Sequence, residues 1–261
     1  MSDAEVAVQC RREGAVATVT LNRPESHNAL TTEMKDELRA AMSDVASDST
    51  VRAVVLTAAG RSFCVGQDLE EHAAALADGA EAAFDTVRTH YSPIVRLLRA
   101  MPKPVIAAVH GACVGAGLGL ALACDHRVFA PDARLGTAFT GIGLTFDSGL
   151  SVTLPRAVGE ARARGLMLFS RTFSAEDAIR WGISGEIDDE WAQRAEQIAG
   201  ELAAGPTQAF AATKALLDEQ VSWDAALAAE ARAQTECGTT DDHQNAVRAF
   251  LAREVPQFVG R

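Results

Sequence analysis

The sequence predicts an α/β fold, in which strands alternate with helices over about the first 190 residues and only helices follow. The first observation behind this is a series of short β-branched and apolar runs, each followed by apolar residues at helical spacing. The second is that no strand-like run occurs after Ala192. The third is composition: 48% of the 261 residues are hydrophobic and 23% are charged, which is typical of a globular chain and excludes a mainly disordered or coiled-coil protein.

The first predicted elements are two strands with a helix between them. Residues Val16–Leu21 alternate β-branched and small residues, which favours a strand, and Val51–Thr57 predicts a second one. A helix is predicted over Thr31–Ser47, with Thr31 or Thr32 as its N-cap. Its apolar residues recur at helical spacing: Met34, Leu38, Ala41, Met42 and Val45.

The middle of the chain continues the alternation. A short strand is predicted over Ser62–Gly66, running into an acid-rich helix start at Gln67–Glu71 that suits the positive end of a helix dipole. Residues 72 to 100 are predicted to form one or two helices. Three more elements complete this part: a strand over Val105–Val109, a helix over Gly117–Ala123 and a strand over Arg127–Phe129.

The C-terminal third is predicted to be a helical subdomain. Its helices are rich in alanine, and their apolar faces exceed what one adjoining core face can cover. These faces include Ile198, Leu202, Phe210, Leu216, Leu217 and Leu227. We therefore expect a core over residues 1–195 and a helical, oligomer-forming subdomain over residues 196–261.

The net charge and the cysteines indicate which binding partners and which cellular compartment to expect. With 24 Lys and Arg against 35 Asp and Glu, the formal net charge is −11, so binding to nucleic acid or to an anionic membrane is not expected. The apolar run from Pro104 to Cys124 is long enough to span a bilayer, but its glycines and abrupt polar end favour a buried strand and helix. Five cysteines without a CxxC pair or a zinc-ligand spacing predict a cytoplasmic protein with reduced cysteines and no metal.

Two glycine-containing loops, Cys64–Gly66 and Gly115–Gly117, each follow a predicted strand and precede a predicted helix. A dinucleotide-binding GxGxxG motif does not fit the second loop, because Leu120 stands where its last glycine would be. Unpaired peptide N–H groups at a helix N-terminus could face an anionic ligand atom. The alternative is that the glycines only permit close packing of the helix.

The residues around these loops resemble the two signatures of the crotonase, or enoyl-CoA hydratase/isomerase, superfamily. The first runs from Phe63 to Leu69, and the second runs from Lys103 to Gly111 and on into Gly115–Gly117. The resemblance extends over nearly the whole chain, through Leu21–Pro24, Asn28–Leu30, Cys124–Asp125, Leu154–Gly159, Ala249–Leu251, Pro256 and Phe258.

The resemblance implies a crotonase-like spiral of ββα turns with a helical C-terminal trimerisation subdomain, and thus a homotrimer or a dimer of trimers. It implies an acyl-CoA thioester substrate, with coenzyme A entering as part of that substrate and no separate cofactor. The backbone N–H groups of Val65 and Ala116 would form an oxyanion hole for the thioester oxygen. Further contacts with the acyl-CoA are implied for Ser26, His27, Ala29, Cys64, Gln67, Asp68, Leu69, Gly115, Gly117 and Phe139.

Both glutamates that hydratases of this family use are absent. The family places them at positions held here by Gly119 and Phe139, so the acid and the base that hydration needs are missing. One acid remains nearby, Asp147, in a stretch that resembles the ring-epoxide isomerase branch of phenylacetate catabolism. Its apolar neighbours can raise its pKa above the ordinary value of about 3.9 and suit it for proton transfer. Alternatively, Asp147 caps the turn or helix that follows it.

Three functions are compatible with the sequence. The favoured hypothesis is an enoyl-CoA isomerase in which Asp147 moves a proton next to an enolate held by Val65 and Ala116. The alternatives are an enoyl-CoA hydratase of fatty-acid or aromatic-acid degradation and a non-catalytic acyl-CoA-binding protein. Of the other polar residues, Asp68 is expected to cap its helix, and His110 to be a core histidine.

Overall fold

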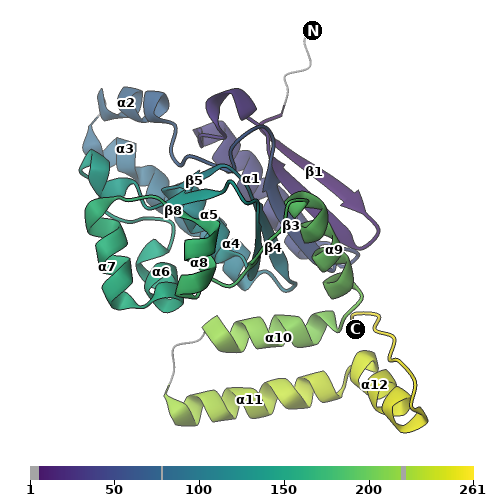
Figure 1. The fold of residues 1–261 in the computed structure, drawn as a ribbon. Helices are drawn as coiled ribbons and strands as arrows, with labels where there is room; N and C mark the ends of the chain where they lie inside the picture. The colour runs from purple at the N-terminus through teal and green to yellow at the C-terminus, as the bar shows by residue number, and fades with distance from the viewer. Residues whose placement is uncertain (1–5, 78, 219–221) are drawn as a thin grey trace.

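The centre of the computed structural model, which describes residues 6–77, 79–218 and 222–261, is a six-stranded sheet (Figure 1). Its strand order is β1-β2-β3-β4-β6-β9, with β1 antiparallel to β2 and all other neighbours parallel. These strands are β1 (Val8–Glu13), β2 (Val16–Leu21), β3 (Ala53–Ala58), β4 (Val105–Val109), β6 (His126–Phe129) and β9 (Glu186–Ile187). A smaller sheet has the order β5-β7-β8 and consists of β5 (Ala112–Val114), β7 (Arg134–Gly136) and β8 (Phe173–Ser174).

Two successive turns of the chain follow the same path through the sheets. From β4 in the large sheet the chain enters β5 in the small sheet and then helix α5 (Ala116–Ala123). From β6 it enters β7 and then, through a 3-10 turn at Phe139–Ile142, helix α6 (Leu150–Val158). This repeated strand, strand and helix confirms the predicted α/β spiral of ββα turns. Helices α7 (Glu160–Phe169) and α8 (Ala175–Trp181) follow α6.

Helices cover both faces of the large sheet, and all five residues of β4 are therefore apolar and buried. The helices are α1 (Thr32–Ser47) and α4 (Ser92–Ala100) on one face and α9 (Trp191–Ala203) on the other. Helix α9 packs on β3, β4 and β6 through Ala195, Ala199 and Ala203. The expected boundary between residues 195 and 196 lies within α9, and the division into two domains stays a prediction.

Most predicted elements are confirmed within two residues. They are the strands expected at 16–21, 51–57, 105–109 and 127–129 and the helices expected at 31–47 and 117–123. Thr31 is the N-cap of α1, and its side chain accepts a hydrogen bond from the amide of the third helical residue at 3.2 Å. The strand predicted over 62–66 is wrong. Only Cys64 forms a bridge there, to Cys113, because the chain turns at Gly66, whose φ of +90° ends the extended run.

Two further details differ from the sequence patterns. Where one or two helices are predicted over residues 72 to 100, the described residues form three: α2 (Leu69–Ala77), α3 (Ala80–Thr86) and α4, with a π-helical turn at Val87–Tyr91 before α4. Strand β1 carries no apolar pattern because five of its six residues are exposed at the edge of the sheet. Its two arginines and glutamate are the polar side chains that keep an edge strand from pairing with another chain.

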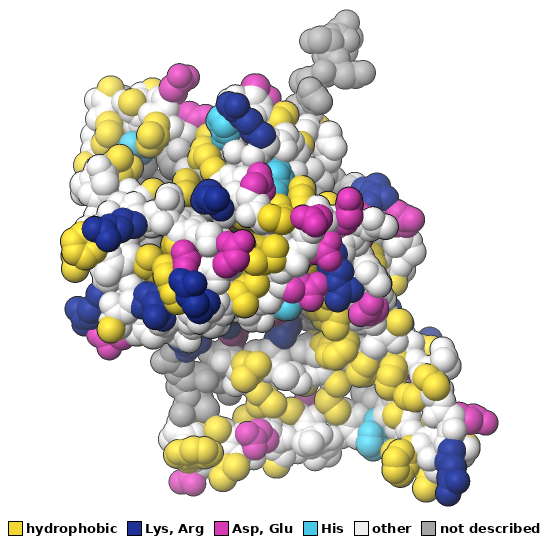
Figure 2. Space-filling model, in the orientation of Figure 1, with side chains coloured by type: hydrophobic (Ala, Val, Ile, Leu, Met, Phe, Trp, Pro, Cys, Tyr) yellow, Lys and Arg dark blue, Asp and Glu magenta, His cyan; other side chains and the backbone are white. Residues whose placement is uncertain are grey.

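Three C-terminal helices form a layer beneath the body of the molecule (Figure 1), which confirms the helical C-terminal region: α10 (Thr207–Asp218), α11 (Trp223–Gly238) and α12 (Asp241–Ala252). Helix α10 is tied to the body by Lys214, whose ammonium lies 2.7 Å from the Asp125 carboxylate, and by an ion pair between Arg99 and Asp218. Hydrophobic side chains lie on the surface of this layer (Figure 2). The large exposed ones include Leu217, Trp223, Leu227, Val247, Phe250 and Leu251.

The long apolar run from Pro104 to Cys124 forms β4, β5 and α5 and lies in the core, as the sequence predicts. Within the described ranges, none of the helices combines the length and the apolar character that crossing a bilayer requires.

Arg127 is a buried cation that joins three parts of the core. Its guanidinium donates to the carbonyl oxygens of Ala121 at 3.2 Å and Cys124 at 2.8 Å, at the C-terminal end of α5. It also donates to the carbonyl oxygens of Asp125 at 3.0 Å and Ser184 at 2.6 Å. One side chain thus satisfies four carbonyl groups, two of which carry the negative end of the α5 dipole.

Replacing Arg127 by Met should lower the free energy of unfolding by about 3 kcal/mol, because buried carbonyl oxygens lose their donors. Arg164→Met is the control, since Arg164 makes an exposed i,i+4 pair with Glu160 and its loss should cost less than about 0.5 kcal/mol. Urea denaturation of both variants measures the difference. Equal losses would contradict the role assigned to Arg127.

Candidate active site

The two glycine-containing loops meet backbone to backbone. Cys64 accepts a hydrogen bond from the Val114 N–H at 3.0 Å, and its own N–H donates to the Ala112 carbonyl at 3.1 Å. A Cβ at Gly117 would lie 2.3 Å from the Cys64 carbonyl oxygen, closer than real Cβ atoms approach. Glycine is therefore required at this position for the loops to meet.

This meeting leaves two N–H groups without acceptors. Among the hydrogen bonds of the described residues, the N–H groups of Val65 and Ala116 have no partner. Ala116 is the first residue of α5, where a helical N–H has no intrahelical acceptor. Gly66, next to Val65, lies close to Ala116, since a Cβ at Gly66 would lie 3.3 Å from the Ala116 nitrogen. Two donors without acceptors among the described residues therefore lie on adjoining loops, the kind of group that stabilises an anionic oxygen in other proteins.

Val65 and Ala116 both line a cavity of about 540 Å³, a size that suits a small organic group. Its apolar lining includes Leu69, Phe84, Val87, Phe139, Ile142 and Leu144. Its polar lining includes Arg23, Ser26, Gln67, Asp68, Tyr91 and Asp147. The cavity therefore joins an apolar chamber to a few polar groups that can orient a ligand.

Asp147 is a half-buried carboxylate on this lining. Burial raises its pKa, while a hydrogen bond from the Ser148 hydroxyl at 2.7 Å and the charge of Lys35 act in the opposite sense. The N-cap of the next helix is Gly149, which makes no side-chain cap. Among the hydrogen bonds of the described residues, the Asp147 carboxylate accepts none from a helix N–H, which argues against the capping alternative.

Gly119 packs against the loop that carries Asp147. A Cβ at this position would lie 2.4 Å from the Ser148 Cβ and 2.8 Å from the Ser148 carbonyl oxygen. A side chain at position 119 therefore cannot coexist with this course of the loop. Phe139 is the second position at which the resemblance to the family leads one to expect a glutamate. It is buried and packs edge-on against Phe146, with ring centroids 5.9 Å apart.

Behind the cavity lies a buried lysine, Lys35 of α1. Its ammonium donates to Gln67 Oε1 at 3.1 Å and to Thr86 Oγ1 at 2.6 Å, and the Tyr91 hydroxyl donates to the same Gln67 oxygen at 2.5 Å. The candidate residues identified from sequence do not include Lys35. A signal is nevertheless present, because position 35 continues the buried stripe of Leu38 and Met42 on α1.

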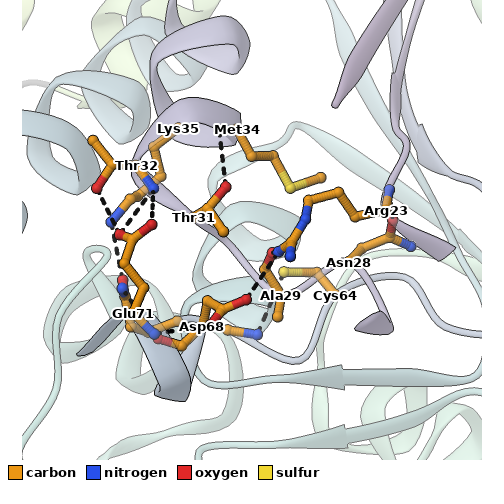
Figure 3. A network of polar contacts seen from close by, with 12 residues as sticks. Arg23, Asn28, Ala29, Thr31, Thr32, Met34, Lys35, Cys64, Asp68 and Glu71 are labelled. Atoms are coloured by element: carbon orange, nitrogen blue, oxygen red, sulfur yellow. Dashed lines mark hydrogen bonds and ion pairs between the residues drawn. The ribbon is translucent and has the colours of Figure 1, made fainter. Parts of the chain in front are cut away.

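The rim of the cavity is held by polar contacts between α2, the turn after β2 and the start of α1 (Figure 3). Arg23 donates to the Asp68 carboxylate at 3.0 Å and also to the Ala29 carbonyl. Asp68 accepts the Glu71 N–H at 3.1 Å, which confirms it as a helix cap. Burial would raise the pKa of Asp68, but these hydrogen bonds and the Arg23 charge lower it. Glu71 in turn accepts the backbone and hydroxyl hydrogen bonds of Thr32.

The structure brings most of the sequence-predicted site residues to one cavity. Those on its lining are Ser26, Ala29, Val65, Gln67, Asp68, Leu69, Gly115, Ala116, Phe139 and Asp147. Three others lie off it. His27 contacts Ser62 and Arg61, and Cys64 is fully buried with Gly117 packed on it. Burial raises the pKa of the Cys64 thiol to about 12, so it stays protonated.

His110 is a core residue, as the sequence predicts. Its Nε2 lies 2.9 Å from the Gly60 carbonyl oxygen, and its ring stacks on Trp191 with centroids 4.2 Å apart. Burial lowers its pKa, so it is a neutral packing residue. Among the residues that the structure describes, no cluster of three His, Cys, Asp or Glu side chains could hold a metal ion.

Comparison with known proteins gives matches over nearly the whole chain. A family model described as enoyl-CoA hydratase/isomerase matches residues 11–261. A Rhodobacter capsulatus protein described as a probable enoyl-CoA hydratase is 44% identical over 94% of this chain and 95% of that protein. The 1,2-epoxyphenylacetyl-CoA isomerase of Escherichia coli is 40% identical over 95% of this chain and 97% of that protein.

The fold also matches a solved structure of a protein assigned to this family. It is that of a Mycobacterium abscessus protein provisionally assigned as an enoyl-CoA hydratase/isomerase, and it is 48% identical to this chain. The two superpose with a TM-score of 0.93 over 98% of this chain and 100% of that one.

The packing of Gly119 on Ser148 is testable with two glycine-to-alanine variants. Gly119→Ala should lower the free energy of unfolding by about 1–3 kcal/mol, because overpacking outweighs the gain in helix propensity. Gly200→Ala is the matched control, since Gly200 also lies within a helix but its Cβ would meet nothing within 4 Å. It should raise stability by up to about 1 kcal/mol. Chemical denaturation compares them, and stabilisation by both would show that the contact with Ser148 is not limiting.

Proposed function

The chain belongs to the enoyl-CoA hydratase/isomerase family, and we propose that it is an enoyl-CoA isomerase that uses Asp147 to move a proton along the acyl group of an acyl-CoA thioester. The arrangement of the cavity supports this most directly. The Val65 and Ala116 loops and the Asp147 carboxylate border the same space. A pair of oxyanion donors and a proton acceptor are the two parts that an enolate mechanism requires.

In the proposed reaction, the Asp147 carboxylate takes a proton from the α carbon, next to the thioester carbonyl. The electrons of that C–H bond move onto the carbonyl oxygen as an enolate, whose charge the N–H groups of Val65 and Ala116 stabilise. Asp147 then returns the proton to the γ carbon while the carbonyl re-forms. The double bond moves from the β,γ to the α,β position, and no atom is gained or lost.

The surroundings of Asp147 fit a base that acts on carbon. Burial raises its pKa, which brings the carboxylate closer to the basicity that proton abstraction needs. The Ser148 hydroxyl holds one carboxylate oxygen at 2.7 Å, which leaves the other oxygen for the substrate. We therefore assign the proton shuttle to Asp147.

Hydration is the second candidate, because a relative described as a probable hydratase is 44% identical. Adding water needs one group to activate the water and another to protonate the α carbon. Gly119 and Phe139 stand where family hydratases carry glutamates, and each is packed against a neighbour. Of the carboxylates on the cavity lining, Asp68 is held by an arginine and a helix N–H, and Glu70 is exposed. Asp147 is left for proton transfer, which favours isomerisation.

For the acyl group we propose a ring-bearing or unsaturated chain of aromatic-acid or fatty-acid catabolism. The isomerase at 40% identity is named for 1,2-epoxyphenylacetyl-CoA, an ester with a ring-bearing acyl group. The rings of Phe84, Tyr91 and Phe139 on the cavity lining suit a flat apolar group. We propose that Ser26 and Ala29, on the same lining, contact the coenzyme A part of the substrate, and that no separate cofactor takes part.

We also propose a homotrimer, or a dimer of trimers, in the cytoplasm. Large apolar side chains are exposed on α10 to α12 (Figure 2), and an exposed apolar surface of this kind supports association with further copies of the chain. All five cysteines are free thiols, which suits a reducing compartment.

Asp147→Asn should lower kcat for isomerisation of a 3-enoyl-CoA by about 10²–10⁴-fold and leave the affinity for a non-reactive acyl-CoA nearly unchanged. The amide keeps the shape but cannot accept a proton from carbon. Asp241→Asn, which alters an exposed pair with Arg261, is the control and should keep full activity. Undiminished turnover in Asp147→Asn would refute the shuttle, and fast hydration of crotonyl-CoA by the wild type would favour the hydratase instead. Absence of any turnover would favour the non-catalytic binding protein.

Light scattering of dilute protein should give three or six times the mass of a single chain. The expected association buries the apolar side chains of the C-terminal helices, such as Phe250 and Leu251. A single-chain mass at micromolar concentration would be incompatible with this assembly.

A further inference from the structure

The ammonium group of Lys35 is fully buried beside the cavity, where each of its N–H bonds needs a partner. It donates to Thr86 Oγ1 at 2.6 Å and to Gln67 Oε1 at 3.1 Å. It also lies 5.2 Å from the centroid of the Tyr91 ring, within the range of a cation–π contact. Thr86, Gln67 and Tyr91 all border the cavity, whereas Lys35 itself does not. Lys35 is therefore separated from the cavity by side chains that line it, and it contacts these three directly.

The contact with Lys35 determines how the Gln67 amide is oriented. An ammonium group can only donate, so the glutamine must present its oxygen and not its nitrogen. The Tyr91 hydroxyl donates to the same oxygen at 2.5 Å. With its oxygen engaged by Lys35 and Tyr91, Gln67 can offer a ligand only the two N–H bonds of Nε2. Among the described residues, Nε2 has one contact, at 3.5 Å with the Asp68 carbonyl oxygen, so at least one N–H bond has no acceptor.

We propose that Gln67 is a specificity-determining hydrogen-bond donor toward the acyl group, and that Lys35 is the positioning residue that sets the direction of the amide. The ligand class that follows is an acyl-CoA whose acyl group carries an acceptor atom, such as an ether or carbonyl oxygen. Gln67 stands two residues after Val65, so this donor belongs to the same loop as the proposed oxyanion hole. The inference rests on the proposed function in one respect, that the cavity takes an acyl-CoA thioester.

The groups around Lys35 favour its charged form, which can only donate hydrogen bonds and so keeps the Gln67 oxygen turned toward it. Burial lowers the pKa of Lys35, and four carboxylates oppose that shift and favour the charged ammonium. Beyond Thr86, the His90 Nδ1 lies 3.0 Å from the Thr86 hydroxyl, and burial lowers the His90 pKa, which favours the neutral ring. The Thr86 hydroxyl thus accepts a hydrogen bond from Lys35 and has a second contact with His90 Nδ1, which Thr89 Oγ1 also contacts at 3.1 Å. The four carboxylates are those of Glu71, Asp36, Asp147 and Asp68.

Equilibrium binding of two matched esters tests the proposal without turnover. The probes are cyclohexylacetyl-CoA and (tetrahydropyran-2-yl)acetyl-CoA, in which an ether oxygen replaces one ring CH₂ group. Calorimetric titration gives the ratio of their dissociation constants. The wild type should bind the ether ester about three- to tenfold more tightly, the worth of one added hydrogen bond. Because neither ester has a double bond to move, failure of the isomerase proposal leaves this measurement valid.

Gln67→Glu is the sharpest variant, because it keeps the side-chain shape and the pairing with Lys35 but replaces the N–H donors with an acceptor. It should invert the ratio, so that the hydrocarbon ester binds more tightly. Lys35→Met should bring the ratio to about one, since the amide can then turn over. Lys103→Met is the matched control. Lys103 is also buried, but its ammonium donates to the carbonyl oxygens of Val45 at 2.7 Å and Asp48 at 2.8 Å, off the cavity lining.

Equal affinity of the wild type for the two esters would overturn the proposal, as would a Gln67→Glu variant that still prefers the ether ester. A Lys35→Met variant with the wild-type ratio would overturn the role of Lys35, as would an equal loss of preference in Lys103→Met. If Lys35→Met does not fold, Lys35→Gln replaces it, because a neutral amide there can accept as well as donate and also releases Gln67.

Discussion

The close approach of the two loops at Cys64–Gly66 and Gly115–Gly117 is the constraint on which the rest of the site depends. Only a residue without a Cβ fits at Gly117, which lies against the Cys64 carbonyl. The approach leaves the N–H groups of Val65 and Ala116 beside one cavity and without acceptors in the described structure. Unpaired donors are costly in a folded protein, so this pair is a feature that the core around it must stabilise.

A second glycine, Gly119, links the choice of chemistry to the shape of the backbone. The position that would carry a hydratase glutamate is packed against Ser148, so the loop that presents Asp147 occupies its space. In the proposed mechanism the acid comes instead from Asp147, on a different segment. A side chain at position 119 would meet Ser148, the residue next to Asp147, and would require this segment to move.

Three buried cations in this fold each contact specific oxygen atoms. Arg127 binds four carbonyl groups, Lys103 binds two, and Lys35 binds one amide and one hydroxyl oxygen. A buried charge is expensive to desolvate and gives little net stability, but it admits only acceptors around it. At Arg127 and Lys103 this requirement joins backbone segments, whereas at Lys35 it orients a side chain on the cavity lining.

The sequence by itself determined the features that depend on neighbouring residues. These include the buried strands, the Thr31 and Asp68 caps, and the glycine loops that carry the Val65 and Ala116 N–H groups, because local periodicity and backbone freedom specify them. Only the tertiary structure decided that Gly119 meets Ser148, that Lys35 holds Gln67, and that His27 and Cys64 lie off the cavity lining. These contacts join residues far apart in the chain, and their geometry follows from how the helices and loops pack on the sheets.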